Sequence, residues 1–202
     1  MRGRNSGLGY GGSCFPKDTK ALHWLSNEHG YELKTIKATI EVNENQKYKL
    51  FRKAKRIFGS LKGKKVAVLG LTFKPGTDDL REAPSIPNVR RLLDEGAEIV
   101  AYDPVGIENF KRIYPTEIKY VNSVEAALEN ANMTFIFTEW EEIKDLDIKE
   151  YKNLMKTPII FDGRNCYDLK DVNNENIDYY SIGREEIINY SKNTLKEVAV
   201  TV

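Results

Sequence analysis

The stretch VAVLGLTFKPGTDDLREAPS, residues 66–85, decides the fold of this chain. It opens with the apolar run Val66 to Leu69, which ends at Gly70. A short apolar run bounded by turn residues is typical of a parallel strand buried on both faces. A polar loop follows, and then a helix expected over about 86–95 leads to a second strand over 98–102. Because strand, helix and strand form the repeating unit of a parallel sheet, this stretch predicts an α/β protein.

The same alternation continues toward the C-terminus. Ser123 is a good candidate for a helix N-cap, because its hydroxyl can accept a hydrogen bond from a free backbone N–H of the first turn. The whole pattern predicts an α/β fold with a Rossmann-like open, mostly parallel sheet and helices on both faces. The further elements that we expect are a helix over 107–113, a strand over 119–121, a helix over 123–130, a strand over 133–137, a helix over 148–155 and strands over 158–162 and 178–182.

Two helices are expected before the sheet. A short one covers 18–29, and a long one covers 33–59 with apolar residues that mostly follow a 3.6-residue period. Asn43 and Lys47 interrupt that apolar stripe. At 1.5 Å per residue the long helix would extend about 40 Å, which is more than a small domain needs. We therefore expect it to bridge two domains or to pair with a partner chain.

The bulk composition excludes several classes of protein. The formal net charge of +1 gives no overall field that would attract nucleic acid, although the first 60 residues are basic and the remainder is acidic. No apolar run approaches the roughly 20 residues that a membrane span needs, and no signal peptide is recognisable. The two cysteines, Cys14 and Cys166, are not spaced as metal ligands. We expect a cytoplasmic protein with no bound metal, no nucleic-acid partner and no membrane partner.

The segment GLGYGGSCFPKD, residues 7–18, surrounds Cys14 with unusual neighbours. Its glycines allow close approach of the backbone to a ligand and positive φ angles. Lys17 favours a thiolate at Cys14 by its charge, and Asp18 could orient Lys17 or a water molecule. The segment therefore indicates an activated thiol in a tight loop at a helix start. On spacing alone, a glycine-rich turn with an incidental cysteine remains an open alternative.

The loop after the first strand carries two cations. Gly70 is followed next by Gly76, so the loop is not the Gly-x-Gly-x-x-Gly fingerprint of a dinucleotide site. Lys74 and Arg81 nevertheless lie where a doubly wound sheet binds phosphate, beyond the carboxyl end of a strand. A charged surface loop is the alternative. Asp103 ends the second strand, and without the fingerprint we interpret it as a turn-forming residue.

The segment GGSCFPKD, residues 11–18, resembles the nucleophile motif of the UDP-glucose 6-dehydrogenase family, and the whole chain resembles the C-terminal half of that family. The resemblance implies that a C6 alcohol is oxidised to an aldehyde, which the Cys14 thiolate attacks. The thiohemiacetal then loses a second hydride to NAD, and water cleaves the thioester. It further implies that Lys17 stabilises an oxyanion and that Asp18 positions water. The residues that it implies as lining of the sugar-nucleotide pocket are Tyr10, Gly11, Gly12 and Phe15.

Two further segments resemble signatures of the same family. The segment GLTFKPGTDDLREAP, residues 70–84, resembles the second signature, with Ala83 as a minor departure. That resemblance implies that Phe73 and Lys74 contact UDP and that Arg81 reaches toward the NAD phosphates. The segment FDGRN, residues 161–165, resembles the third signature and implies that Arg164 contacts the nucleotide sugar.

The resemblance also divides the chain. It implies that residues 1–60 form the catalytic-cysteine loop and a central helical segment that makes a homodimer through helix 33–59. Residues 61–202 would form the UDP-sugar-binding Rossmann-like domain. In the family the NAD-binding domain precedes this region, so we expect that the chain alone does not oxidise UDP-glucose.

The choice of sugar nucleotide stays open. Ser13 and Lys17 favour UDP-glucose over the UDP-N-acetylhexosamines, because relatives that act on those sugars tend to carry His and Val there. GDP-mannose dehydrogenases share the Gly-Ser-Cys-x-Pro-Lys-Asp pattern and are the nearest rival. A non-catalytic module that binds a nucleotide sugar and dimerises is the remaining alternative.

Overall fold

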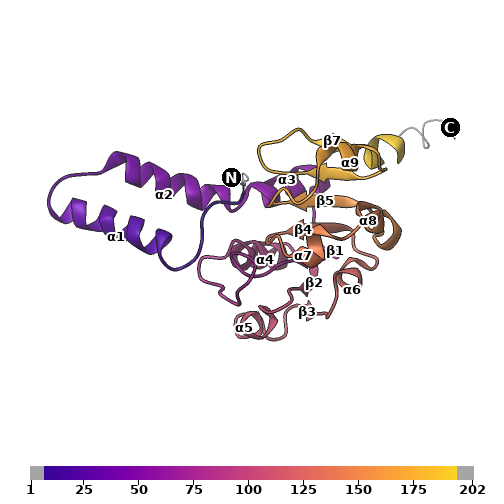
Figure 1. The fold of residues 1–202 in the computed structure, drawn as a ribbon, viewed down its shortest axis with the longest axis horizontal. Helices are drawn as coiled ribbons and strands as arrows, with labels where there is room; N and C mark the ends of the chain where they lie inside the picture. The colour runs from indigo at the N-terminus through magenta and orange to yellow at the C-terminus, as the bar shows by residue number, and fades with distance from the viewer. Residues whose placement is uncertain (1–6, 195–202) are drawn as a thin grey trace.

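Seven strands form one sheet in the computed structural model, which describes residues 7–194, and a helical hairpin projects from the sheet (Figure 1). Residues 1–6 and 195–202, at the ends of the two expected domains, lie outside the described residues. The strand order is β3-β2-β1-β4-β5-β6-β7. The strands are β1 (Lys65–Leu69), β2 (Glu98–Tyr102), β3 (Lys119–Tyr120), β4 (Met133–Ile136), β5 (Ile159–Asp162), β6 (Asp178–Tyr180) and β7 (Ile187–Ile188).

All paired strands run parallel except β7, which pairs antiparallel with β6. The predicted mostly parallel sheet is confirmed, whereas β7 was not predicted. The strand order reverses between β1 and β4. Ligands of such open sheets bind beyond the carboxyl ends of the strands at that switch point.

Helices cover both faces of the sheet, as predicted. Alternate residues of β1 point to opposite faces, so that Val66 and Val68 join one hydrophobic cluster and Ala67 and Leu69 join the other. The first face carries α3 (Lys49–Phe58), α4 (Ser85–Asp94) and α5 (Ile107–Lys111). The second face carries α6 (Val124–Leu128), α7 (Glu141–Lys144), α8 (Ile148–Leu154) and α9 (Leu169–Asn173).

The prediction of one continuous helix over 33–59 is wrong. The chain forms α2 (Lys34–Gln46) and then α3, with a break at Lys47 and Tyr48. The amide of Asn88, from α4, donates to the carbonyl oxygen of Lys47 across 2.9 Å. A side chain that takes a helical carbonyl in this way interrupts the helical hydrogen-bond ladder.

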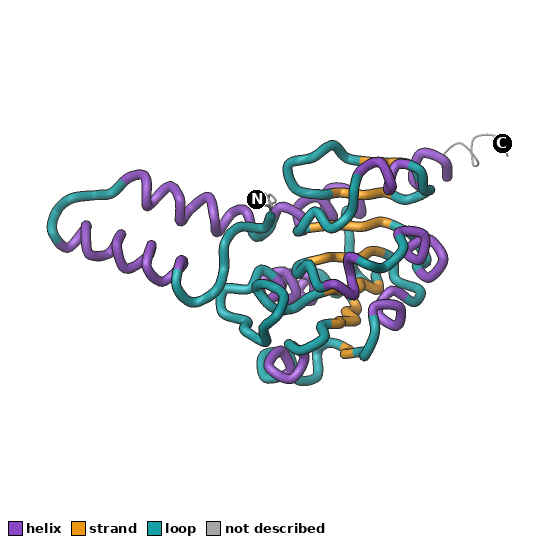
Figure 2. Tube along the Cα trace, in the orientation of Figure 1, coloured by secondary structure: helices purple, strands orange, loops and turns teal. Residues whose placement is uncertain are grey.

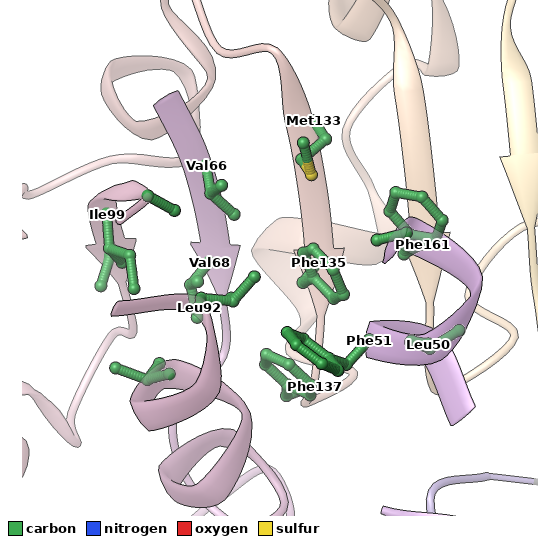
Figure 3. Close-up of a cluster of buried hydrophobic side chains, with 14 of the residues drawn as sticks. Leu50, Phe51, Val66, Val68, Leu92, Ile99, Met133, Phe135, Phe137 and Phe161 are labelled. Atoms are coloured by element: carbon green, nitrogen blue, oxygen red, sulfur yellow. The ribbon is translucent and has the colours of Figure 1, made fainter. Parts of the chain in front are cut away.

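The break turns α3 onto the sheet. Leu50 and Phe51 of α3 pack against the strand residues Phe135 and Phe161 in the first hydrophobic cluster (Figure 3). Helix α2 instead lies beside α1 (Phe15–Glu28), and the two form an antiparallel hairpin that extends away from the sheet (Figures 1 and 2). α1 begins at Phe15, earlier than expected, with Cys14 as its N-cap.

Asp103 has the structural role that was predicted for it. Its carboxylate is buried at the end of β2 and accepts hydrogen bonds from the backbone N–H of Leu71 at 2.7 Å and of Gly106 at 2.6 Å. It also accepts the indole N–H of Trp140 at 2.9 Å. The carboxylate therefore ties the loop after β1 to the ends of β2 and β4.

Candidate functional site

The loop that leads to Cys14 is fixed from two sides. On the side of α2, Asn43 Oδ1 accepts the N–H of Tyr10 at 2.7 Å, and Gln46 Nε2 donates to the carbonyl oxygen of Gly7 at 2.6 Å. On the other side, the N–H of Gly12 donates to the carbonyl oxygen of Arg81 at 2.9 Å. The loop after β1 and helix α2 therefore hold the Cys14 loop between them.

Two glycines allow this close approach. A Cβ atom on Gly11 would lie 2.7 Å from the carbonyl oxygen of Glu82. Gly12 has a φ of +84°, and a Cβ atom there would lie 2.9 Å from the ring of Phe73. Both distances are shorter than side chains tolerate, so the loop can pack here only without side chains. Steric crowding thus explains why glycines occupy positions 11 and 12 of the Cys14 loop.

Cys14 is exposed at the start of α1, with its Sγ 3.6 Å from Ser13 Oγ. Lys17 and Asp18 follow in the first turn of the helix, and Lys17 Nζ lies 3.3 Å from Asp18 Oδ1. Both side chains are exposed. Because a charged pair in water is strongly screened, the pairing holds neither side chain firmly.

Most of the candidate residues gather in one open pocket of about 560 Å³, here called the Cys14 pocket. It brings a thiol from the start of α1 together with an aromatic ring and an ammonium group from the loop after β1. Lys74 Nζ lies 5.3 Å from the centre of the Phe73 ring. Lys17 and Asp18 do not line the Cys14 pocket. The residues that line this pocket are Gly11, Gly12, Ser13, Cys14, Phe15, Phe73, Lys74, Gly76, Thr77 and Asp79.

A second hollow of about 660 Å³, the Tyr10 pocket, lies between the Cys14 loop and α2. Tyr10 and Arg164 line it together with Val42 and Asn43 of the helix. The two pockets adjoin, because the rings of Tyr10 and Phe15 meet edge to face with their centres 4.5 Å apart. An apolar wall with one cation suits a ligand that has both a flat ring and an anionic group.

Arg164 connects the two pockets. Its Nη2 donates to the carbonyl oxygen of Phe73, so the arginine from the end of β5 reaches the loop after β1. Its Nε lies 2.8 Å from Glu139 Oε2, which makes an ion pair by distance. That contact is not aligned as a hydrogen bond, and both atoms are buried without another hydrogen-bond partner. The guanidinium is therefore held by two contacts, one to Glu139 and one to the carbonyl oxygen of Phe73.

Arg81 lies outside both pockets, in a third hollow of about 580 Å³ that Asp78, Asn109 and Arg112 also line. Its guanidinium makes three hydrogen bonds to the Asp79 carboxylate, at 2.9 Å, 3.1 Å and 2.7 Å. Those bonds raise the pKa of Arg81, and the charge of a Cys14 thiolate adds to the rise. Arg81 is thus an exposed cation on the rim next to Cys14.

The turn that carries Arg164 was marked in the sequence only by its resemblance to the third family signature, and the role of Asp162 in that turn was not predicted. Asp162 is fully buried, and its carboxylate accepts the N–H groups of Arg164 and of Cys166, both at 2.7 Å. Leu8 packs over Gly163, where a Cβ atom would lie 2.4 Å from the leucine side chain. An Asp-Gly pair at a strand end is common in ordinary turns, so the sequence alone gave no distinguishing signal. Burial raises the pKa of the Cys166 thiol, so this cysteine stays a neutral thiol that packs beside the turn.

Within residues 7–194, the structure contains no helix long and apolar enough to cross a membrane. Over the same residues, no group of three or more His, Cys, Asp or Glu side chains is arranged to hold a metal ion.

An open, mostly parallel sheet with pockets beside the loops beyond its strands places the chain among the doubly wound α/β proteins, which bind ligands at that edge of the sheet. Comparison with known proteins narrows that class. Residues 67–169 match the UDP binding domain of the UDP-glucose/GDP-mannose dehydrogenase family, and residues 2–45 match its central domain. The chain belongs to the UDP-glucose/GDP-mannose dehydrogenase family.

Several relatives carry names in this family. The UDP-glucose 6-dehydrogenase YwqF of Bacillus subtilis is 45% identical over 91% of this chain, and AglM of Haloferax volcanii, also a UDP-glucose 6-dehydrogenase, is 41% identical over 88%. A solved UDP-glucose dehydrogenase from Pyrobaculum islandicum superposes with a TM-score of 0.75 at 34% identity, covering 86% of this chain and 38% of its own. The chain spans only 42% of the length of YwqF and 39% of AglM.

Proposed function

We propose that this chain is the catalytic-cysteine and UDP-sugar-binding part of an NAD-dependent UDP-glucose 6-dehydrogenase. The observation that carries the proposal is the Cys14 pocket, in which one open space is shared by Cys14 and Lys74. A nucleophilic thiol beside an ammonium group suits a substrate that has an electrophilic carbon and a phosphate. The names of the relatives that match most of this chain favour the same reaction.

Cys14 is the proposed nucleophile. Its thiolate adds to the C6 aldehyde of the sugar and forms a thiohemiacetal, which loses hydride to become a thioester. Water then releases the carboxylate and regenerates the thiol. We propose that Lys17 stabilises the oxyanion of the adduct and that Asp18 positions the water. Because both side chains are exposed and only loosely paired, they can turn toward a sugar bound at Cys14.

The remaining pocket residues are proposed to bind the nucleotide sugar. Lys74 and Arg164 would hold the diphosphate, since each carries a cation beyond the carboxyl end of a strand. Arg164 supports this role because it lines the Tyr10 pocket while Glu139 and the carbonyl oxygen of Phe73 fix its guanidinium. The residues proposed to pack around the rest of the ligand are Tyr10, Gly11, Gly12, Phe15 and Phe73.

NAD, when bound, would accept the hydride that leaves the C6 alcohol and the hydride that leaves the thiohemiacetal. Arg81 fits an NAD phosphate because it is an exposed guanidinium on the rim next to Cys14. The loop after β1 lacks the Gly-x-Gly-x-x-Gly fingerprint, and the glycines at 7, 9 and 12, which have that spacing, lead into α1 from a loop and follow no strand among the described residues. We therefore propose that a part of the full protein outside this chain binds most of the cofactor. Oxidation of UDP-glucose would then require the longer protein.

Calorimetric titration tests the nucleotide site. UDP is expected to bind this chain at least about tenfold more tightly than GDP does, and Lys74→Met is expected to weaken UDP binding about tenfold, the loss of one charge-assisted contact to phosphate. Lys62→Met is the matched control, since Lys62 is also an exposed lysine but lies outside the Cys14 pocket. Tighter binding of GDP would instead favour a GDP-mannose dehydrogenase, and no binding of either nucleotide would contradict the proposal.

We also propose that residues 1–60 form the Cys14 loop together with a homodimerisation segment, and that residues 61–202 form the UDP-sugar-binding domain. The hairpin of α1 and α2 supports pairing because it leaves Trp24, Leu25 and Val42 exposed. Helix α3 already packs on the sheet, so the pairing surface would lie on α2 and α1. Sedimentation equilibrium is expected to give the mass of two chains. The mass of one chain at micromolar concentration would contradict the pairing.

A further inference from the structure

The turn over residues 162–166, which carries Arg164, depends on one buried carboxylate. Asp162 Oδ1 accepts the N–H of Arg164 at 2.7 Å, and Asp162 Oδ2 accepts the N–H of Cys166, also at 2.7 Å. Both bonds act inside the turn, so they fix the direction in which the Arg164 side chain leaves the backbone. The position of that guanidinium in the Tyr10 pocket therefore depends on where the Asp162 carboxylate lies.

Two residues farther along the chain hold this carboxylate. The hydroxyl of Tyr179, on β6, donates to Asp162 Oδ2 at 2.6 Å. Arg184 Nη2 in turn donates to the Tyr179 oxygen at 2.8 Å. Arg184 is itself fixed, because its Nη1 donates to the carbonyl oxygen of Tyr167 at 2.8 Å and its Nε donates to Ser181 Oγ at 3.1 Å. A continuous line of hydrogen bonds thus runs from Arg184 to the turn.

We propose that Tyr179 and Arg184 are positioning residues for Arg164, and that they act by holding the Asp162 carboxylate in its charged form beneath the nucleotide site. The proposal rests on the proposed function, because it assigns Arg164 to the nucleotide. A charged carboxylate offers acceptors to both N–H groups of the turn and to Tyr179 at once. A protonated carboxyl has fewer acceptor sites for these three donors, and its own O–H needs a hydrogen-bond acceptor in the buried turn. Protonation therefore disturbs the turn.

The surroundings of Asp162 make its charge dependent on these donors. Burial raises the pKa of Asp162, while the Tyr179 hydroxyl, the two turn N–H groups and the charge of Arg184 lower it. Burial raises the pKa of three other groups near the carboxylate, which are Cys166, Tyr167 and Tyr151 of α8. These three groups therefore stay neutral in acid. Glu139 and Arg164 form an ion pair beside the same turn. Tyr179 and Arg184 are the side chains whose removal takes away a contribution that lowers the pKa of Asp162.

Tyr179→Phe tests the proposal. Loss of the hydroxyl raises the pKa of Asp162 further, so the variant loses the charged form at a higher pH than the unaltered chain does. Affinity for UDP, measured by calorimetry between about pH 8 and about pH 5, is expected to be nearly unchanged at the upper end and at least about fivefold weaker at the lower end. Arg184→Met is expected to shift the pH profile in the same direction.

Tyr151→Phe is the matched control. Tyr151 is fully buried and its hydroxyl lies 2.8 Å from the hydroxyl of Tyr167, so this variant also loses one buried phenolic hydrogen bond but leaves the three hydrogen bonds to Asp162 in place. Its pH profile for UDP binding is expected to match that of the unaltered chain. A loss of affinity in Tyr179→Phe that is the same at every pH, or that Tyr151→Phe reproduces, would overturn the proposal.

Hydrogen exchange separates this inference from the proposed function. At about pH 5 and without nucleotide, the backbone amides of Arg164 and Cys166 are expected to exchange at least about tenfold faster in Tyr179→Phe than in Tyr151→Phe, since a protonated Asp162 carboxyl protects them less. Unchanged exchange would overturn the positioning role even if UDP binds as proposed. Faster exchange in a chain whose unaltered form does not bind UDP would contradict the proposed function and, with it, the assignment of Arg164 to a nucleotide.

Discussion

Gly70→Ala is expected to lower the free energy of unfolding by about 3 kcal/mol, the sum of backbone strain and a steric clash. Gly70 ends β1 with a φ of +80°, a conformation that residues with a Cβ atom rarely adopt. A Cβ atom there would lie 2.6 Å from the backbone nitrogen of Thr138, just beyond β4. The clash cannot be relieved by rotation of a side chain, so β1 and β4 must separate at the switch point of the sheet.

Gly76→Ala provides the control for this substitution. Gly76 lies in the same loop with a φ of +76°, but a Cβ atom there would meet nothing within 4 Å. It should therefore show the strain alone, about 1 kcal/mol. Urea unfolding of both variants measures the difference directly. Equal losses would show that the close contact between Gly70 and Thr138 contributes nothing beyond backbone strain.

The sheet could be predicted from the sequence because its signals are local. Runs such as Val66 to Leu69 are apolar throughout, and they end at glycines or turn residues that lie next to them in the chain. The break between α2 and α3 could not be predicted in this way, since it depends on Asn88 of α4, which is distant in sequence. Periodicity describes the face that a helix buries, but not a hydrogen bond that a later element makes to its backbone.

The candidate site, like the fold, could be predicted from the sequence only in part. The glycines before Cys14 and the cations Lys74 and Arg81 stood out in the sequence, and the structure brings Cys14 and Lys74 into one pocket. The residues that support this pocket did not stand out. Asn43 was visible only as an interruption of an apolar stripe, yet its side chain bonds to both the N–H and the carbonyl oxygen of Tyr10. Polar residues that break an amphipathic pattern are therefore useful markers of loops held against a helix.

Lys47 is the other interruption, and it identifies a charge cluster that fixes the Cys14 loop. Only 4% exposed, it bonds to Glu44 at 3.0 Å and to Glu82 at 2.8 Å, while Lys20 of α1 bonds to the second oxygen of Glu82 at 2.8 Å. Glu82 has a φ of +55°, which is strained for a residue with a side chain. Since the carbonyl oxygen of Glu82 packs against Gly11, its two ion pairs stabilise the backbone that holds the loop.

Glu82→Gln is therefore expected to lower the free energy of unfolding by about 2 kcal/mol, less than for a fully buried pair because Glu44 remains. The ion pairs with Lys20 and Lys47 hold the pKa of Glu82 below the ordinary value of a glutamate. The stabilisation is then present above that value and is lost as the pH falls through the lowered pKa, where the unaltered carboxyl is neutral too. The difference between the two proteins in urea unfolding should accordingly shrink in acid.

Glu186→Gln is the matched control for this effect. Glu186 also joins two cations, Lys53 at 3.0 Å and Arg56 at 3.2 Å, and its side chain is about as exposed as that of Glu82. Its cations are more accessible than Lys47, so its loss should cost less than about 1 kcal/mol. Hydrogen exchange over residues 8–15 should increase in Glu82→Gln and stay unchanged in Glu186→Gln. Equal exchange in the two variants would mean that the Cys14 loop is held by its backbone contacts to Asn43 and Arg81 without help from the charge cluster.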